Sequence, residues 1–325
     1  MKILVVGGAG YIGSHMLRRL QKTNYKVEVL DNLSTGYEEN TLGFQFHKCD
    51  LANKDQLNSI LQNNYDLVMH FASYINVGES YLYPQKYYEN NVNNTMNLLN
   101  CMVDQKILNF IFSSSAAVYG DPGPSPISEE ENINPVNPYG QTKAMVENIL
   151  KDYDRAYGLK STCLRYFNAC GAHLDGTIGE SHNPETHLIP LVLQAASGRK
   201  NSITVFGDDY TTKDGTCIRD YIHVMDLAEA HLLALDTLRS KQISNIYNIG
   251  NNIGFSVKEI IETAEEVTQR KIKINIESRR KGDPAQLVAN NKKIKEELNW
   301  TAQYSDLKTI ISSAWQWEQK LLQSN

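Results

Sequence analysis

The residues at the start of the chain restrict the folds that it can adopt. Lys2–Val6 is a short apolar run rich in β-branched residues. Three glycines follow at a spacing of three, Gly7, Gly10 and Gly13, and apolar residues then recur at helical spacing up to Leu20. This order predicts a strand, a tight glycine turn and a helix. Because glycine has no side chain, such a turn lets the backbone approach a pyrophosphate, which the amides and dipole at the helix start stabilise.

A second strand is expected at Lys26–Asp31, and it ends in an acid. In a dinucleotide-binding unit, an acid at this place accepts hydrogen bonds from the adenosine ribose hydroxyls and repels a 2′-phosphate. Asp31 therefore favours NAD over NADP.

Strand and helix patterns continue to alternate. We expect further strands at 44–49, 66–71, 109–113 and 161–166, and helices at 54–61, 87–103 and from 139 onward. Alternating apolar strands and helices predict an α/β fold, a Rossmann-type doubly wound parallel sheet. The alternation stops near residue 170. We expect an NAD-binding domain at 1–170, onto which segments near 221–250 pack back, and a smaller α/β substrate domain at 171–325.

Ligands of parallel sheets bind beyond the carboxyl ends of the strands. Polar and small residues stand at those ends: Asp50, Phe71, Ala72, Ser73, Ser113, Ser115, Tyr166 and Asn168. These positions are candidates for a cofactor and substrate site, although serines at strand ends also serve simply to satisfy backbone groups.

Tyr139 and Lys143 stand four residues apart at the start of a predicted helix, so they share one face. A free Tyr titrates near pH ~10, and bringing its pKa to about 7 takes roughly 4 kcal/mol of preferential phenolate stabilisation. A nearby ammonium supplies part of that. Ser115, at a strand end, could hydrogen-bond both the phenol and a substrate oxygen. The simpler alternative is a surface Tyr above a solvated Lys.

Composition narrows the classes of partner. With 325 residues, 41% hydrophobic and 21% charged, the chain fits a globular protein of about two domains. A net charge of -5 without a long basic run disfavours nucleic-acid and membrane partners. The five cysteines are scattered without a CxxC pair, the N-terminus reads as a strand instead of a secretion signal, and no apolar run reaches membrane length. We expect a cytoplasmic protein that binds small molecules.

Seven stretches together resemble a known family. They are Gly7–His15, Asp31–Leu33, Val77–Ser80, Phe112–Gly120, Leu164–Asn168, Gly215–Val224 and Arg279–Asp283. The chain resembles the extended short-chain dehydrogenase/reductase family over almost its whole length, and within it the enzymes that epimerise nucleotide sugars at C4. The resemblance implies NAD-dependent interconversion of UDP-glucose and UDP-galactose through a 4-keto intermediate. It also implies a homodimer, with apolar helical faces near 92–103 and 144–153 available for a four-helix bundle.

The resemblance further implies roles for single residues. Ser115, Tyr139 and Lys143 are the expected catalytic residues. The expected NAD contacts are Gly7, Gly10, Tyr11, Ile12, Gly13, Asp31, Asn32, Asp50, Leu51, Phe71, Ala72, Ser73, Asn91, Ser113, Tyr139, Lys143 and Tyr166. The expected UDP-sugar contacts are Ser115, Asn168, His187, Leu188, Thr204, Phe206, Arg219, Arg280, Asp283 and Leu287.

Several positions bear on the choice between reactions. Related sugar-nucleotide dehydratases carry Asp-Glu where this chain has Ala116 and Ala117, which cannot move protons, so dehydration is disfavoured. Ile75 stands where many relatives have Lys, which removes one cofactor contact. Leu287 matches a position whose size governs room for a 2-acetamido group. Epimerisation of UDP-N-acetylhexosamines or UDP-pentoses, a net reductase, and a silent NAD-binding regulator remain alternatives.

A metal site is not predicted. Cys170, His173, His182 and His187 lie within one polar stretch, but their spacing is not a standard zinc pattern.

Overall fold

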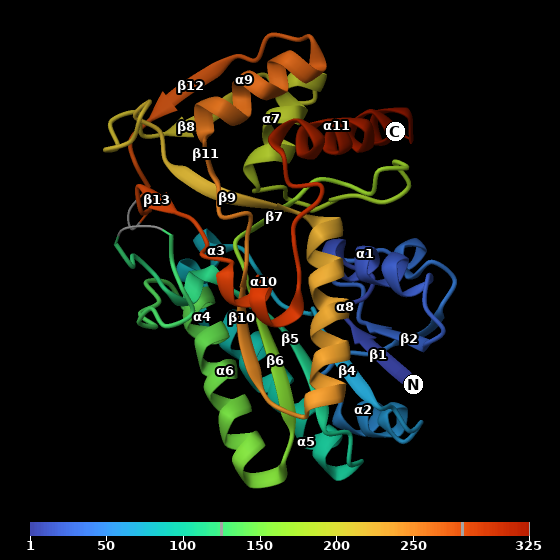
Figure 1. Ribbon diagram of the computed structural model, residues 1–325. Helices are drawn as coiled ribbons and strands as arrows, with labels where there is room; N and C mark the ends of the chain where they lie inside the picture. Colours follow the sequence, from blue (N-terminus) through green and yellow to red (C-terminus); the bar gives the residue numbers. More distant parts are fainter. Residues whose placement is uncertain (124–125, 281–282, 325) are drawn as a thin grey trace. The chain divides into compact units, whose positions relative to one another are not determined.

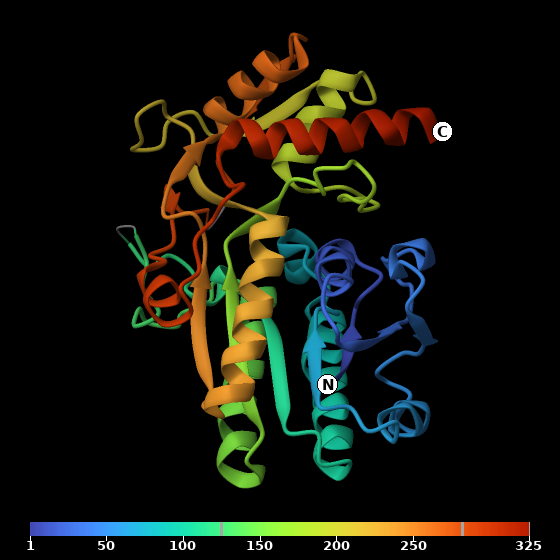
Figure 2. The ribbon, with the colours of Figure 1, turned by 45° about the vertical axis from the view of Figure 1, so that its right-hand side comes forward.

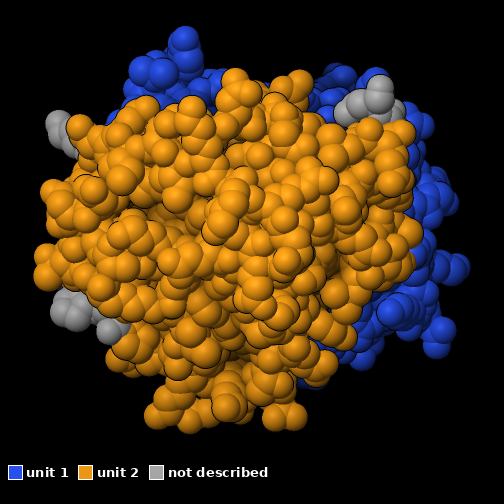
Figure 3. All heavy atoms as spheres, turned by 90° about the horizontal axis from the view of Figure 1, so that it is seen from above, with its two compact units in different colours: residues 1–120, 132–166, 228–247 blue, residues 121–131, 167–227, 248–325 orange. Residues whose placement is uncertain are grey.

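The structure is a computed structural model that describes residues 1–123, 126–280 and 283–324. Its elements are labelled in Figure 1. Contacts divide the chain into two compact units, coloured separately in Figure 3. Unit 1 comprises Met1–Gly120, Asn132–Tyr166 and Ala228–Tyr247, and unit 2 comprises Asp121–Glu131, Phe167–Leu227 and Asn248–Asn325. Lys281 and Gly282, in the middle of the Arg279–Asp283 motif, lie outside the described residues.

Unit 1 is built on a seven-stranded sheet of order β10-β6-β5-β4-β1-β2-β3. The pairs that join β1 to β6 are all parallel. The strands are β1 (Lys2–Val6), β2 (Lys26–Asp31), β3 (Gln45–Lys48), β4 (Leu67–His70), β5 (Asn109–Ser115), β6 (Lys160–Tyr166) and β10 (Asn245–Ile249). The order reverses between β1 and β4, which is the switch point of a Rossmann sheet. The predicted fold class is confirmed.

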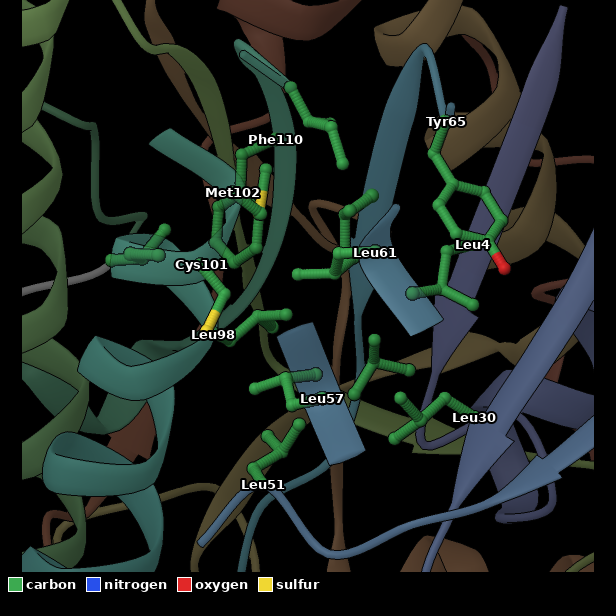
Figure 4. Packing of buried hydrophobic residues seen from close by; sticks show 14 of the residues in the cluster. Leu4, Leu30, Leu51, Leu57, Leu61, Tyr65, Leu98, Cys101, Met102 and Phe110 are labelled. Atoms are coloured by element: carbon green, nitrogen blue, oxygen red, sulfur yellow. The ribbon is translucent and has the colours of Figure 1, made fainter. Parts of the chain in front are cut away.

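Helices cover this sheet because its strands are apolar on both faces. They are α1 (Tyr11–Leu20), α2 (Lys54–Leu61), α3 (Val77–Leu82), α4 (Pro84–Tyr87), α5 (Asn94–Asp104), α6 (Pro138–Tyr157) and the part of α8 (Val224–Lys241) after Leu227. Short 3₁₀ turns lie at η1 (Glu38–Thr41) and η3 (Ala116–Val118). In Figures 1 and 2, α6 runs alongside β5 and β6. Figure 4 shows the core beneath α2 and α5, where Leu57, Leu98 and Phe110 are fully buried.

The helix predicted at 87–103 is interrupted by a π-helical segment, η2 (Tyr88–Asn93). The Asn91 side chain bonds to both main-chain groups of Tyr74, accepting from its nitrogen at 2.9 Å and donating to its oxygen at 3.0 Å. It also donates to Thr142 Oγ1 of α6 at 3.1 Å. Such segments are frequent at functional sites, and this one fixes the loop after β4 against α6.

Unit 2 combines small sheets with a group of packed helices. Its strands are β7 (Asn168–Cys170), β8 (Ile203–Phe206), β9 (Ile218–His223), β11 (Gly254–Ser256), β12 (Ile274–Glu277) and β13 (Gln286–Leu287). Its helices are α7 (Leu188–Ser197), α9 (Val257–Thr268), α10 (Lys292–Leu298) and α11 (Leu307–Ser324). β9 pairs with β7, β11 and β13. Figure 2 shows α7, α9 and α11 gathered together, and they enclose the apolar core of this unit.

None of the described helices is both long enough and apolar enough to cross a bilayer.

Candidate active site

At Gly7 and Gly13, the first glycine turn has no room for a side chain. Gly7 has φ +78°, and a Cβ there would lie 2.4 Å from the Ala72 nitrogen. A Cβ on Gly13 would lie 2.2 Å from the Gly7 carbonyl oxygen. Gly10 is the N-cap of α1 and offers no capping side chain. The start of α1 and the ends of β1 and β4 therefore lie as close together as their backbones allow. A loop that binds a pyrophosphate needs this form.

Asp31 ends β2 beside this turn. Its carboxylate accepts hydrogen bonds from Ala9 N at 3.0 Å and Leu33 N at 2.8 Å. The side chain is only 8% exposed, and burial raises the pKa of the carboxyl group above its usual value. Next to it, Asn32 donates to Asp50 Oδ2 at 2.8 Å. The ends of β2 and β3 are thus tied together by two predicted cofactor residues.

The other predicted cofactor residues border the same edge of the sheet. Tyr11 and Ile12 open α1, Leu51 follows β3, and Ser113 belongs to β5. Phe71, Ala72 and Ser73 follow β4, and the Phe71 ring lies 4.9 Å from that of His231. Tyr166, at the end of β6, has its hydroxyl hydrogen-bonded to His231 Nε2.

Tyr139, Lys143 and Ser115 meet at the carboxyl end of β5. Asn137 caps α6 by accepting from Gly140 N at 2.7 Å, and Pro138 starts the helix. The Lys143 ammonium lies 5.8 Å from the Tyr139 ring centroid and donates to the Ser113 carbonyl oxygen at 2.7 Å. The Ser115 side chain accepts from Ala117 N at 3.1 Å, and its proximity to Tyr139 lowers the pKa of that phenol. The predicted shared face of Tyr139 and Lys143 is confirmed.

The pKa values of Tyr139 and Lys143 differ from those that their spacing on the helix suggests. Burial raises the pKa of the Tyr139 phenol, and Ser115 lowers it by less. Burial also lowers the pKa of Lys143 to about 7, although the charge of Glu147 raises it. The lysine is 3% exposed, and desolvation penalises its ammonium. The protein alone therefore does not lower the phenol pKa, and a further positive charge at this place is needed to favour the phenolate.

A buried network behind Lys143 was not foreseen. Glu147, one helical turn further along α6, binds Arg165 of β6 through Nε at 2.9 Å and Nη2 at 2.6 Å. Ser114 donates to the same carboxylate at 2.6 Å, and Arg165 Nη1 donates to the Tyr119 hydroxyl at 2.7 Å. The four-residue spacing from Lys143 to Glu147 was the signal in the sequence that could have found it.

In unit 2, β9 brings four predicted substrate residues together. Arg219 donates to Asp283 Oδ1 at 2.5 Å. Leu287 of β13 is the register partner of Arg219. Asn168 of β7 donates to the Asp220 carbonyl oxygen at 2.8 Å. A guanidinium, a carboxylate and an amide thus surround one end of a short sheet.

The other predicted substrate residues of unit 2 form two groups, one at β8 and one at the start of α7. Thr204 and Phe206 belong to β8, and the Arg280 guanidinium lies 3.9 Å from the centroid of the Phe206 ring. His187 is the N-cap of α7 and Leu188 its first residue.

Comparisons with known proteins agree with this geometry. Residues 3–250 match the model of the NAD dependent epimerase/dehydratase family. A UDP-glucose 4-epimerase from Halalkalibacterium halodurans is 47% identical over 321 residues, covering 98% of this chain and 96% of the relative. The crystal structure of UDP-glucose 4-epimerase from Brucella ovis in complex with NAD has a TM-score of 0.94 at 46% identity, covering 97% of both chains. The UDP-Glc/GlcNAc 4-epimerase of Campylobacter jejuni has a TM-score of 0.86 at 43% identity, covering 98% of this chain and 99% of that one. The chain therefore belongs to the NAD-dependent epimerase/dehydratase family.

Proposed function

We propose that this protein interconverts UDP-glucose and UDP-galactose by transient oxidation at C4, through a 4-keto sugar. The observation that carries the proposal is that Lys143 lies beside Tyr139 on α6, near the end of the strand that carries Ser115, in a chain 47% identical to a UDP-glucose 4-epimerase. No net redox change occurs in such a cycle.

We propose that unit 1 holds NAD. The glycine turn before α1 fits a pyrophosphate, because a Cβ at Gly7 or Gly13 would overlap backbone. The Asp31 carboxylate stands where adenosine ribose hydroxyls are recognised. Bound NAD supplies a positive charge near Tyr139 and accepts and returns the hydride of the sugar C4.

In this scheme Tyr139 takes the proton of the sugar 4-hydroxyl and later gives it back. Its phenol must be a phenolate for the first step, and cationic groups near it favour that form. Lys143 holds its ammonium between the phenol and the Ser113 carbonyl oxygen. Ser115, at the end of β5, lowers the pKa of the phenol and would steady the oxygen at C4.

We propose that unit 2 binds the UDP part. Arg219 and Arg280 carry the positive charge that a diphosphate requires, and an Arg fork matches phosphate oxygens. Asp283 would bind the uridine ribose, and Asn168 a group near the diphosphate. The β8 backbone at Thr204 and Phe206 would line the uracil, with His187 and Leu188 at the start of α7 completing the contacts.

We further propose a cytoplasmic homodimer. All five cysteines are free, as a reducing compartment requires. Met96 on α5 and Met145 on α6 are 36% and 37% exposed, on the helices that would form a four-helix bundle with a second copy. Light scattering of the purified protein tests this state directly.

The activity is tested by incubating purified protein with UDP-galactose and no added cofactor. We expect bound NAD in the absorbance spectrum, accumulation of UDP-glucose, and no net formation of NADH. Retained NAD without turnover would contradict the proposal and favour another sugar or a silent regulator, which a panel of UDP-pentoses and UDP-hexosamines separates. Conversion that consumes one NADH for each product would indicate a reductase.

A second activity, epimerisation of UDP-GlcNAc, is favoured by Leu287. The side chain is smaller than a Tyr, and the Campylobacter jejuni relative is a UDP-Glc/GlcNAc 4-epimerase. We expect Leu287→Tyr to lower kcat/KM for UDP-GlcNAc by about tenfold or more, because pocket size sets discrimination of this order. UDP-galactose turnover should change little. Leu287→Met, which conserves volume, is the control. Equal losses for both sugars in Leu287→Tyr would show that the position does not select the C2 substituent.

A further inference from the structure

Four side chains of the loop between β7 and α7 converge on one point. They are Glu180, His182, Glu185 and His187, and one ligand atom from each lies within 4.8 Å of all the others. Glu180 Oε1 lies 3.0 Å from His182 Nδ1 and 2.8 Å from His187 Nδ1. Glu185 Oε1 lies 3.0 Å from His187 Nδ1, and its Oε2 lies 3.8 Å from His182 Nδ1.

These distances lie close to those of a coordination shell, although the three shortest are ion-pair distances. Where metal-ligand bonds are about 2.0–2.2 Å, neighbouring ligands of a tetrahedral site lie roughly 3.3–3.6 Å apart. Here the carboxylate–imidazole pairs are separated by 2.8 to 3.8 Å, and all four ligand atoms lie within 4.8 Å of one another, so small shifts of the side chains would admit an ion. Both imidazoles present the same ring atom, Nδ1, to the same two carboxylates, and the side chains of Glu180 and Glu185 are only 6% and 5% exposed.

Two sets of contacts hold the loop in place. Trp317 of α11 donates its indole N–H to the Glu180 carbonyl oxygen at 2.8 Å, and Gly179 lies so close to this indole that a Cβ would be 2.3 Å away. At the other end, Glu185 Oε1 accepts from the backbone nitrogens of Thr186 and His187 at 2.7 and 2.8 Å. Contacts of this kind orient metal ligands before an ion arrives.

We propose that Glu180, His182, Glu185 and His187 bind one divalent transition-metal ion, with zinc as the best match. Imidazole nitrogens suit zinc and its neighbours in the first row better than magnesium or calcium. Two carboxylates balance the charge of a dication. Four protein ligands close the site, as in structural zinc sites, so the ion would fix the loop and the start of α7 without taking part in the chemistry.

The sequence did not predict this site because the candidate metal ligands included two residues, Cys170 and His173, that do not belong to the cluster. Cys170 donates its thiol to the Ile222 carbonyl oxygen, and His173 pairs with Asp175 at 2.7 Å. Two carboxylates five residues apart complete the cluster instead. Acidic residues in a polar loop follow no spacing that identifies them as metal ligands.

The inference is tested on the full chain by metal content, so it does not depend on the proposed activity. Protein stripped with a chelator is titrated with Zn²⁺ and, separately, with Co²⁺, whose visible absorption reports coordination geometry. We expect one equivalent of metal per chain, a tetrahedral Co²⁺ spectrum, and a higher Tm in the zinc-loaded protein.

Two conservative variants and one control locate the ion. Glu180→Gln and His182→Gln should each lower the affinity for zinc by about tenfold or more, because loss of a ligand weakens the site more than loss of its supporting contacts. His173→Gln, in the same loop but outside the cluster, should bind like the unaltered protein. Circular dichroism confirms that each variant is folded.

Three results would overturn the proposal. One is the absence of saturable binding at one equivalent in the unaltered protein, which leaves the four residues as an ion-pair cluster. Another is an octahedral Co²⁺ spectrum, which indicates surface-bound ions. The third is equal affinity in Glu180→Gln, His182→Gln and His173→Gln.

Discussion

Tyr139→Phe is expected to lower turnover of UDP-galactose by about 100-fold or more, within the range of general acid-base catalysis. The substitution removes only the hydroxyl, whose pKa Ser115 lowers, and it leaves the ring beside Lys143. Steady-state kcat at saturating substrate measures the effect.

A matched control lies on the same helix. Tyr157, near the end of α6, is 53% exposed, so Tyr157→Phe should keep kcat within about twofold, as surface substitutions usually do. NAD content must be measured in both variants. Near-normal turnover by Tyr139→Phe would refute the catalytic assignment, and loss of NAD together with activity would make Tyr139 a binding residue instead.

Glu147→Ala is expected to lower the free energy of unfolding by about 3–5 kcal/mol, because it leaves a buried guanidinium without its counter-ion. The side chains of Glu147 and Arg165 are each 3% exposed, so bulk solvent screens the pair little. Since whole domains are stable by only about 5–15 kcal/mol, the loss is large. Urea unfolding followed by circular dichroism gives the shift in midpoint.

The control again comes from α6. Asp152 pairs with Arg155 at 3.3 Å, but both side chains are more than 70% exposed, at 74% and 79%. Asp152→Ala should therefore cost less than about 1 kcal/mol. If Glu147→Ala shifted the midpoint no more than Asp152→Ala, the buried pair would contribute nothing measurable. The Glu147 charge also favours the Lys143 ammonium, so its removal should reduce activity at neutral pH in the molecules that remain folded.

The parts of the fold that local sequence determines were predictable. Lys26–Asp31 was predicted as a strand and is β2 with the same bounds, because its apolar residues lie in a sheet covered on both faces. The helix predicted from residue 139 onward begins at Pro138, because Asn137 caps it and Pro138 suits its first turn.

Other parts depend on distant contacts. β9 was recognised as a motif but not as a strand, because Arg219 and Asp220 break an apolar pattern. Asp220 is buried all the same, since its carboxylate accepts hydrogen bonds from the backbone nitrogens of Asn251, Asn252 and Ala289. Such partners lie about 30 to 70 residues away in sequence, where no periodicity reaches.

The candidate site likewise has parts that local sequence predicts and parts that depend on distant contacts. Tyr139 and Lys143 were predictable because one helix sets their separation. Their protonation was not, because the burial that raises the phenol pKa and lowers the lysine pKa depends on the packing around them. The Glu147–Arg165 pair joins α6 to β6, and only the folded sheet brings its members together.

The return of the chain to unit 1 has a consequence for its synthesis. β10 completes the sheet beside β6, yet about 80 residues separate the ends of these strands, which a ribosome takes roughly 4 to 16 seconds to add. During that interval the nascent protein carries β6 as an unpaired edge, open to pairing with other chains. A chaperone that covers this edge would have to act before residue 249 leaves the ribosomal exit tunnel.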